Sequence, residues 1–218
     1  MKKNNPYKKI SKKLLACFFI LILTIFIFFI FRNPYKNIKN IHNNPNKVII
    51  AFGNSITYGY GIDRTRSFVN LLSEKTGEKI INAGRSGDTT EDALKRIEED
   101  VLSLDPKLVL IEFGGNDFMQ NFPQETTKHN LERMIDLIQK KGAVVILIAV
   151  PSISGSFNDV FKNIAKNKKC AYIPNILKGI MARPNLMIDQ IHPNENGNKI
   201  VADKIYKVLK PVLEEMKK

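Results

Sequence analysis

The feature that most constrains this chain is an alternation, from Lys47 onward, between short β-branched runs and longer segments of helical period. Such an alternation is typical of parallel βαβ units. The third and fourth runs are almost continuously apolar, as expected of central strands that are covered on both faces. The predicted strands are Val48–Phe52, Lys79–Asn82, Leu108–Phe113, Val144–Val150 and Ala171–Ile173.

Helical segments lie between and after these strands. Apolar residues recur at intervals of three and four over residues 93–101 and 131–138, and the longest such stripe covers residues 200–216. Pro211 lies inside this last stripe, where a proline can kink or end a helix. The sequence therefore predicts a three-layer α/β/α sandwich over residues 47–218, with a parallel sheet of about five strands.

The N-terminal part has a different character. Residues 14–31 form an apolar run without a charge, which as a helix spans about 27 Å, close to the hydrocarbon thickness of a bilayer. Six lysines precede the run within residues 1–13, more than the basic residues that closely follow it, and this bias favours a cytoplasmic N-terminus. We therefore expect a single-pass cell-membrane protein, with an anchor at 14–31, a linker at 32–46 and residues 47–218 outside the cytoplasm.

The alternative is a cleaved secretory signal, which would release the domain. Such signals usually have an apolar core of about 7 to 15 residues followed by a small-residue cleavage site. Here the run ends in bulky residues at 28–31, and no Ala-x-Ala pattern follows. An uncleaved anchor is therefore favoured.

The formal net charge of +13 belongs mainly to the N-terminal part. Ten Lys or Arg and no acidic residue lie between Met1 and Lys47, whereas 24 basic and 21 acidic residues follow. The domain has no basic stripe interleaved with aromatic residues, so a nucleic acid is not an expected partner. Cys17 lies in the apolar run and Cys170 is alone in the domain, which excludes a disulfide within the domain.

In open parallel sheets, ligands bind outside the carboxyl ends of the strands. After the first predicted strand, a Gly-Asn-Ser turn at residues 53–55 places the hydroxyl of Ser55 at its tip, although this tripeptide is also common in ordinary turns. After the second, residues 82–90 form a small-residue loop that enters a helix. Its backbone N–H groups could receive an anion, or Asp88 or Thr89 could cap the helix.

The third predicted strand is followed by Gly-Gly-Asn-Asp at residues 114–117. The glycines would let the backbone approach a ligand closely, and the amide of Asn116 can donate a hydrogen bond. A plain turn is the alternative for this tetrapeptide taken alone.

An acid-histidine pair precedes the last helix. Asp189 stands three residues before His192, and within one turn this spacing lets the carboxylate fix the imidazole tautomer and stabilise its charged form. A serine nucleophile needs such a base. His42 lies in the linker and His129 at a polar helix start without a nearby acid, so His192 is the only credible base.

In this order and at these strand ends, the four blocks resemble the SGNH or GDSL-like hydrolase superfamily, from about Lys47 to the C-terminus. Residues 182–187 and 191–194 look most like its thioesterase/lysophospholipase/arylesterase branch. The matching positions are Gly53-Asn54-Ser55 for the nucleophile block, Gly87, Gly114-Gly115-Asn116-Asp117, and Asp189 with His192.

The resemblance implies an ester or thioester hydrolase that needs no metal or organic cofactor. Ser55 would attack the carbonyl, His192 would take its proton, and Asp189 would orient the imidazole. The oxyanion would be held by the backbone N–H groups of Ser55 and Gly87 and by the side-chain amide of Asn116. The supporting residues would be Gly53, Asn54 and Asp117.

Asn54 departs from the family pattern, which usually has an aspartate there. An asparagine oxygen can still accept a hydrogen bond but carries no charge, so we expect slower or retuned catalysis. The alternative is a catalytically weak or inactive binding module at the membrane surface. A nucleotide-binding domain of flavodoxin-like topology is disfavoured, because the chain lacks both G-x-G-x-x-G and the P-loop lysine pattern.

The substrate stays open between lipid-like acyl esters and O-acetylated surface glycans, and the sequence does not set the oligomeric state. Several apolar residues near the predicted mouth could line an acyl pocket. They are Phe52, Ile56, Tyr58, Phe118, Met119, Phe122 and Ile153.

Overall fold

The computed structural model describes residues 14–24, 33–42, 48–149 and 156–218. The chain divides into two compact units, residues 1–36 and 37–218. In the first unit, residues 14–24 are helical. No helix within the described ranges is long and apolar enough to cross a membrane. The expected anchor at 14–31 extends into residues 25–31, which lie outside these ranges, as does the basic segment 1–13.

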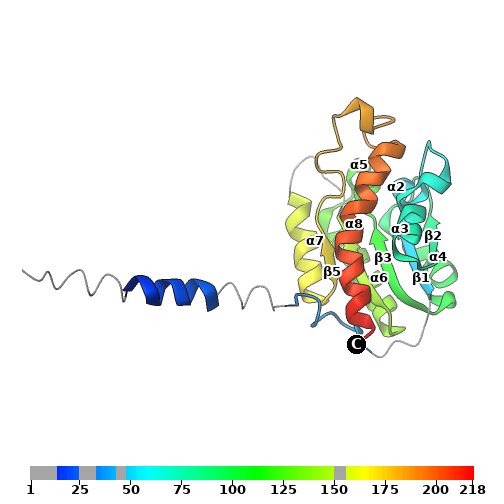
Figure 1. Cartoon of the computed structure of the whole chain (residues 1–218). Coiled ribbons are helices and arrows are strands. Elements are labelled where there is room, and N and C mark those ends of the chain that lie inside the picture. Colours follow the sequence, from blue (N-terminus) through cyan, green and yellow to red (C-terminus); the bar gives the residue numbers. More distant parts are fainter. Residues whose placement is uncertain (1–13, 25–32, 43–47, 150–155) are drawn as a thin grey trace, which may run out of the picture. The chain divides into compact units, whose positions relative to one another are not determined.

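The second unit is a three-layer α/β/α sandwich around a five-stranded sheet (Figure 1). The strand order is β2-β1-β3-β4-β5, and every neighbouring pair is parallel, which confirms the predicted fold class. The strands are β1 Val48–Gly53, β2 Ile80–Gly84, β3 Pro106–Glu112, β4 Val144–Ile148 and β5 Ala171–Ile173.

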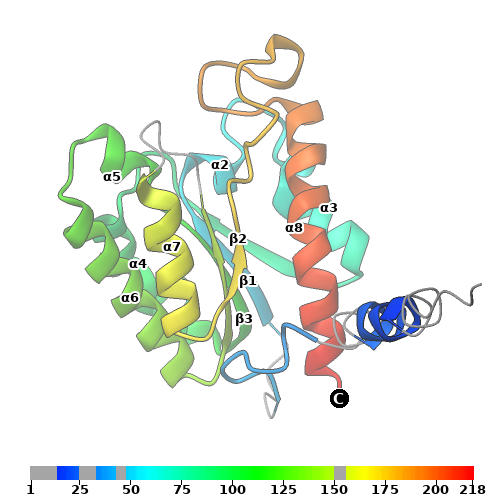
Figure 2. The same cartoon turned by 90° about the vertical axis from the view of Figure 1, so that its left-hand side faces the viewer.

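Helices cover both faces of the sheet, as Figure 2 shows. One face carries α3 (Phe68–Thr76) and α8 (Glu195–Met216); the other carries α4 (Thr90–Asp100), α6 (Gln124–Lys140) and α7 (Ser156–Asn167). Two short helices, α2 (Ser55–Tyr58) and α5 (Gly115–Met119), follow β1 and β3 at the carboxyl edge of the sheet. Single 3₁₀ turns occur at Arg64–Arg66, Leu102–Leu104 and Pro184–Leu186.

The central strand β1 shows how the apolar runs are used. Ile50 and Phe52 are fully buried in a cluster with the apolar faces of α4 and α6. Because successive strand residues point to opposite faces, Ile49 and Ala51 point toward the layer of α3 and α8, and they are buried as well. Burial on both faces explains why the run has no polar residue before the site begins.

The last helix continues past Pro211 to Met216. A proline removes one backbone donor, but Leu209, Val212 and Leu213 on either side of it are buried against the sheet layer. The packing of this apolar face explains why the helix does not end early.

Part of the expected linker packs onto the domain. Ile38 and Ile41 are buried, and the N–H of Lys39 donates to the carbonyl of Lys169 at 2.9 Å. Asn40 Nδ2 donates to the carbonyl of Ala143 at 3.1 Å. Since both acceptors lie just before β4 and β5, residues 38–41 run along the amino edge of the sheet and contribute to the domain.

Candidate active site

The site lies where the sheet order reverses direction. Strands β1 and β3 are neighbours, and the chain runs outward from them on both sides, so their carboxyl ends flank the crevice in which doubly wound sheets bind ligands. The turn with Ser55 follows β1, and the segment with Asn116 follows β3.

Ser55 is the first residue of α2, and its position is fixed by local hydrogen bonds. Asn54 caps the helix, since its Oδ1 accepts from the N–H of Ile56 at 3.0 Å. The carbonyl of Ser55 accepts from the N–H groups of Gly59 at 3.1 Å and Tyr60 at 3.0 Å. The uncharged Asn54 therefore still makes the backbone contact that we expected from an acid at this position.

The structure brings Ser55, His192 and Asp189 together. His192 Nε2 lies 2.9 Å from Ser55 Oγ, and its Nδ1 lies 2.7 Å from Asp189 Oδ2. Asp189 Oδ1 accepts from the N–H groups of Ile191 and His192, at 2.8 Å each. Partial burial raises the pKa of Asp189, but the hydrogen bonds from His192 and Ile191 outweigh it, so the pKa lies below its ordinary value. The three side chains form one continuous hydrogen-bonded chain.

Tyr60 covers one face of this histidine, a contact that sequence reasoning missed. The two ring centroids are 4.5 Å apart, with an angle of 38° between the ring planes. Tyr60 is half exposed, between two glycines that both have positive φ. A Gly-Tyr-Gly sequence alone gives no sign that the ring would stack on a residue far along the chain.

The predicted oxyanion donors are partly brought together. Asn116 lines the same pocket as Ser55, and its Nδ2 donates to the carbonyl of Asp88 at 2.8 Å. Gly87 precedes that residue and has a φ of +87°, but it is not among the residues that line the pocket. The helix cap that we considered for this loop is Thr89, whose side chain forms a capping box with Asp92.

Two of the supporting residues have clear structural roles. Asp117 is fully buried, and its carboxylate accepts from the N–H of Thr90 at 3.0 Å and from the Thr90 hydroxyl, which joins α5 to the start of α4. Gly53 lies so close to α2 that a Cβ there would stand 2.1 Å from Thr57 Oγ1. A larger residue would push the turn that holds Ser55 away from β1.

Glu112, the last residue of β3, is a buried acid beneath this turn that sequence reasoning also missed. Its Oε2 accepts from Thr57 Oγ1 at 2.8 Å and from the Thr57 N–H at 3.3 Å, whereas Oε1 has no hydrogen-bond partner among the described residues. Burial raises the pKa of Glu112 to about 7, against the effect of hydrogen bonds from Thr57 and Asn54. The available signal was an acid within the apolar run Leu108–Phe113.

A pocket of about 210 Å³ opens beside Ser55 and His192. Of the residues that we expected to line it, Ile56, Phe118 and Met119 do so. Phe52 belongs to the core, and Tyr58 and Phe122 are not among the lining residues. Ile153 lies outside the described residues. The remaining lining residues are Asn54, Gly115, Asn116, Leu177, Met181, Gln190 and Ile191.

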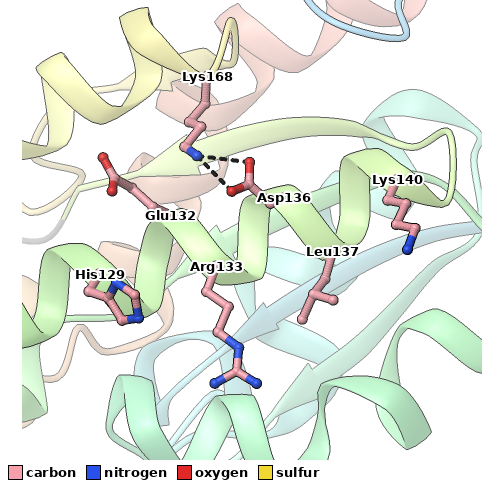
Figure 3. A pocket seen from close by; sticks show the side chains of 7 residues that line it. All are labelled: His129, Glu132, Arg133, Asp136, Leu137, Lys140 and Lys168. Atoms are coloured by element: carbon pink, nitrogen blue, oxygen red, sulfur yellow. Dashed lines mark hydrogen bonds and ion pairs between the residues drawn. The ribbon is translucent and has the colours of Figure 1, made fainter.

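A second hollow lies on α6 and contains His129 (Figure 3). Its side chains are mainly charged, and Lys168 pairs with Asp136 at 2.7 Å. None of its seven lining residues is a serine or cysteine, so it offers His129 no nucleophile. Elsewhere in the described residues, no group of three or more His, Cys, Asp or Glu side chains is arranged to hold a metal ion.

The sequence is similar to those of known ester-bond hydrolases. Residues 51–200 match the GDSL-like lipase/acylhydrolase family. An arylesterase from Vibrio mimicus is 31% identical over 168 residues, which cover 71% of this chain and 84% of that protein. Thioesterase 1/protease 1/lysophospholipase L1 from Escherichia coli is 27% identical, over 76% of this chain and 84% of that protein.

The fold is similar to that of solved esterases. The crystal structure of the psychrotrophic esterase EstA from Pseudoalteromonas sp., inhibited by monoethylphosphonate, superposes with a TM-score of 0.70 at 26% identity. The match covers 78% of this chain and all of EstA. On the sequence match and the shared fold, the chain belongs to the GDSL-like lipase/acylhydrolase family of ester-bond hydrolases.

Proposed function

We propose that this chain is a serine esterase in which Ser55 is the nucleophile, His192 the general base and Asp189 the residue that orients the base. The observation that carries the proposal is the continuous chain of hydrogen bonds, 2.9 Å from Ser55 to His192 and 2.7 Å from His192 to Asp189. A serine hydroxyl is a weak nucleophile until its proton is removed, and an imidazole held by a carboxylate can remove it.

The reaction follows from these contacts. Ser55 Oγ attacks the ester carbonyl while its proton passes to His192 Nε2, and the resulting imidazolium is stabilised by Asp189. When the tetrahedral intermediate collapses, His192 gives this proton to the leaving alcohol or thiol, and the acyl group stays on Ser55. A water molecule then attacks the acyl-enzyme with His192 again as base, which releases the acid and restores the serine.

The negative charge of the intermediate needs donors that are already in place. We assign this task to the backbone N–H groups of Ser55 and Gly87 and to Asn116. One hydrogen of the Asn116 amide is used by the Asp88 carbonyl, which leaves the second for the oxyanion. Loss of one such donor typically lowers the rate about 100- to 1000-fold.

The pocket supports a preference for short acyl groups. Its volume of about 210 Å³ is below the range of about 300–1,000 Å³ that is usual for sites of drug-sized ligands. Ile56, Phe118, Met119, Leu177, Met181 and Ile191 give it an apolar wall. We therefore propose that a short, apolar acyl group enters the pocket, whether the alcohol part belongs to a glycan or to a lipid.

The test compares the full-length protein with Ser55→Ala on p-nitrophenyl acetate, butyrate and octanoate. Ser103→Ala is a matched control, because Ser103 is exposed and its hydroxyl donates to the carbonyl of Glu99 at 2.7 Å. We expect activity in wild type and the control, at least 1000-fold less in Ser55→Ala, and lower kcat/KM for octanoate than for butyrate. Circular dichroism checks that all three are folded.

Equal inactivity of folded wild type and Ser55→Ala would favour the alternative, a binding module without turnover. Asn54 is the feature that raises this alternative. However, its Oδ1 caps α2 at Ile56, and the residues that an esterase needs lie within hydrogen-bond distance of one another. These contacts favour the enzyme.

We also propose that residues 14–31 anchor the protein, with the N-terminus in the cytoplasm and the domain outside. This part of the proposal is supported by the sequence alone, through the length of the apolar run and the lysines before it. The test is alkaline extraction of cell membranes together with protease treatment of intact cells. Release of the protein by alkali, or full protection of the domain from the protease, would contradict it.

A further inference from the structure

Arg96 of α4 carries a buried guanidinium, with 6% of the residue exposed. A buried charge is tolerated only when its hydrogen bonds are satisfied, and this one has partners on several sides. It also stacks on Phe52 and lies near Phe113, at 4.5 and 6.0 Å from the ring centroids. The hydrogen bonds run from Nε to Asp88 Oδ2 (2.6 Å), from Nη1 to Ala83 O (3.0 Å) and Asp100 Oδ2 (2.6 Å), and from Nη2 to Gly53 O (3.1 Å).

These contacts reach each segment that carries a proposed oxyanion donor. Gly53 stands two residues before Ser55, and Asp88 directly follows Gly87. The backbone carbonyl of Asp88 in turn accepts from Asn116 Nδ2 at 2.8 Å. One planar group therefore connects the nucleophile turn, the Gly87 loop and the amide of Asn116.

Besides Arg96 and Asn116, the Gly87 loop is held by Arg85, whose N–H donates to the Gly53 carbonyl at 3.0 Å and whose side chain pairs with Asp100 at 3.5 Å. Gly87 is exposed, and no heavy atom of the described part of the chain lies within 4 Å of the place where its Cβ would stand. With a φ of +87° it holds a backbone conformation that glycine adopts readily. The nearest charged contact of this loop is the ion pair between Asp88 and Arg96.

We propose that Arg96 is a positioning residue of the oxyanion hole: through Gly53 and Asp88 it sets the spacing between the donors on Ser55, Gly87 and Asn116. The proposal rests on the proposed esterase function. Oxyanion donors are effective only near 2.7–3.1 Å from the developing charge, and a displacement of about 1 Å can cost about 100-fold in rate. The fixed fork of a guanidinium can hold two loops in one geometry, which a lysine cannot do.

The chain offers an internal control for a purely structural role. Arg96 pairs with Asp88 in the site loop and with Asp100 on its own helix, both at 2.6 Å. Asp88→Ala removes the contact next to Gly87. Asp100→Ala removes an equally short contact within α4, together with a longer ion pair to the exposed side chain of Arg85 at 3.5 Å, which contributes little. If Arg96 only stabilised the fold, the two substitutions would affect activity alike.

The experiment measures kcat, KM and the thermal midpoint of the full-length protein and its variants with p-nitrophenyl butyrate. We expect Asp88→Ala to lower kcat at least tenfold with KM within twofold, and Asp100→Ala to lower the midpoint but keep kcat within twofold. Arg96→Lys keeps the charge and loses the fork, so its kcat should fall as in Asp88→Ala.

Two negative outcomes have separate meanings. If wild type exceeds Ser55→Ala but Asp88→Ala retains kcat, or loses no more than Asp100→Ala, the positioning role of Arg96 is wrong and the esterase function stands. If wild type does not exceed Ser55→Ala, the esterase function fails and the role of Arg96 fails with it. Should Arg96→Lys not fold, the pair of aspartate variants still decides the question.

Discussion

The ring of Tyr60 lies against the imidazole of His192, with centroids 4.5 Å apart and the planes tilted by 38°. The tyrosine comes from the loop after α2, and the histidine from the segment before α8. The imidazole of His192 therefore lies between Asp189 and an aromatic ring from the loop that follows the Ser55 helix.

For Tyr60→Ala we expect kcat to fall about three- to tenfold, because an aromatic contact of this kind contributes about 0.5–1.5 kcal/mol. Tyr60→Phe retains the ring and should stay within twofold of wild type. Steady-state kinetics with p-nitrophenyl butyrate checks both variants. A loss as large in Tyr60→Phe as in Tyr60→Ala would assign the effect to the hydroxyl and not to the stack.

For Asp189→Asn we expect kcat to fall by about 100- to 10,000-fold, because the amide cannot stabilise the imidazolium and favours the wrong tautomer. The pKa of Asp189 lies below its ordinary value, so the carboxylate keeps its charge as the pH falls toward 4. In a Glu112→Gln background, which removes the buried acid with a pKa of about 7, the acid limb of the pH-rate profile should therefore show the titration of a single group. A limb with two protons would contradict this assignment.

Glu112→Gln should change how stability depends on pH. The folded pKa of Glu112 is raised to about 7 from 4.5, so the folded state favours the protonated form. The contribution of Glu112 to the free energy of unfolding is fully present below pH 4.5 and is lost as the pH rises to about 7. The free energy of unfolding changes by about 3 kcal/mol over this range. Urea unfolding at pH 5 and pH 8 should show this loss in wild type and a smaller one in Glu112→Gln. Equal losses in both proteins would mean that Glu112 does not titrate in this range.

Asn54→Asp introduces the acid that is usual in the family next to this buried glutamate. The new carboxylate could still accept from the N–H of Ile56, so we expect kcat to change by less than about tenfold. A second carboxyl group would raise the pKa of Glu112 further and extend the loss of stability to higher pH. Kinetics and the same unfolding series measure the two effects. If kcat instead rose by about two orders of magnitude, Asn54 would be the residue that limits the natural enzyme.

Gly84→Ala tests the close contact between β2 and α2. A Cβ at residue 84 would stand 2.3 Å from the backbone nitrogen of Tyr58, so α2, which begins with Ser55, would have to move. We expect a loss of about 1–3 kcal/mol in unfolding free energy and at least tenfold in kcat. Gly142→Ala is the matched control: its φ is +85°, but no heavy atom of the described residues lies within 4 Å of the place where a Cβ would stand. It should lower stability by about 1 kcal/mol and leave kcat unchanged.

The repeating part of the fold was accessible from the sequence because strand burial and helix period leave local patterns. The predicted bounds of the five strands lie within two residues of the observed ones in the described ranges. Runs such as Leu108–Phe113 are almost entirely apolar, and such runs are stable only when they are buried. Ser55, Asp189 and His192 were accessible for a different reason, because each follows a strand or precedes a helix within a recognisable block. No local sequence pattern determines the distances between these side chains, which come from the structure.

The supporting contacts were not accessible because they depend on how distant elements pack. Arg96 is a charged residue on a helix, for which the sequence predicts exposure to solvent. It is buried because α4 packs close to the ends of β1 and β2. Glu112 interrupts an apolar strand, which sequence reasoning treated as part of the core. Likewise, Ile38 and Ile41 were assigned to a linker, because two apolar residues are too few to show a period.

The short segment at residues 38–41 determines at which end of the sheet the chain enters the domain. It follows the amino edge of the sheet, whereas Ser55, Asn116 and His192 gather at the carboxyl edge, and both views of the fold show these as opposite ends. An affinity tag, a fused protein or a solid support joined ahead of residue 38 would therefore leave the mouth of the pocket open to substrate. A group attached to the segment before α8, which carries His192, would instead obstruct the mouth of the pocket.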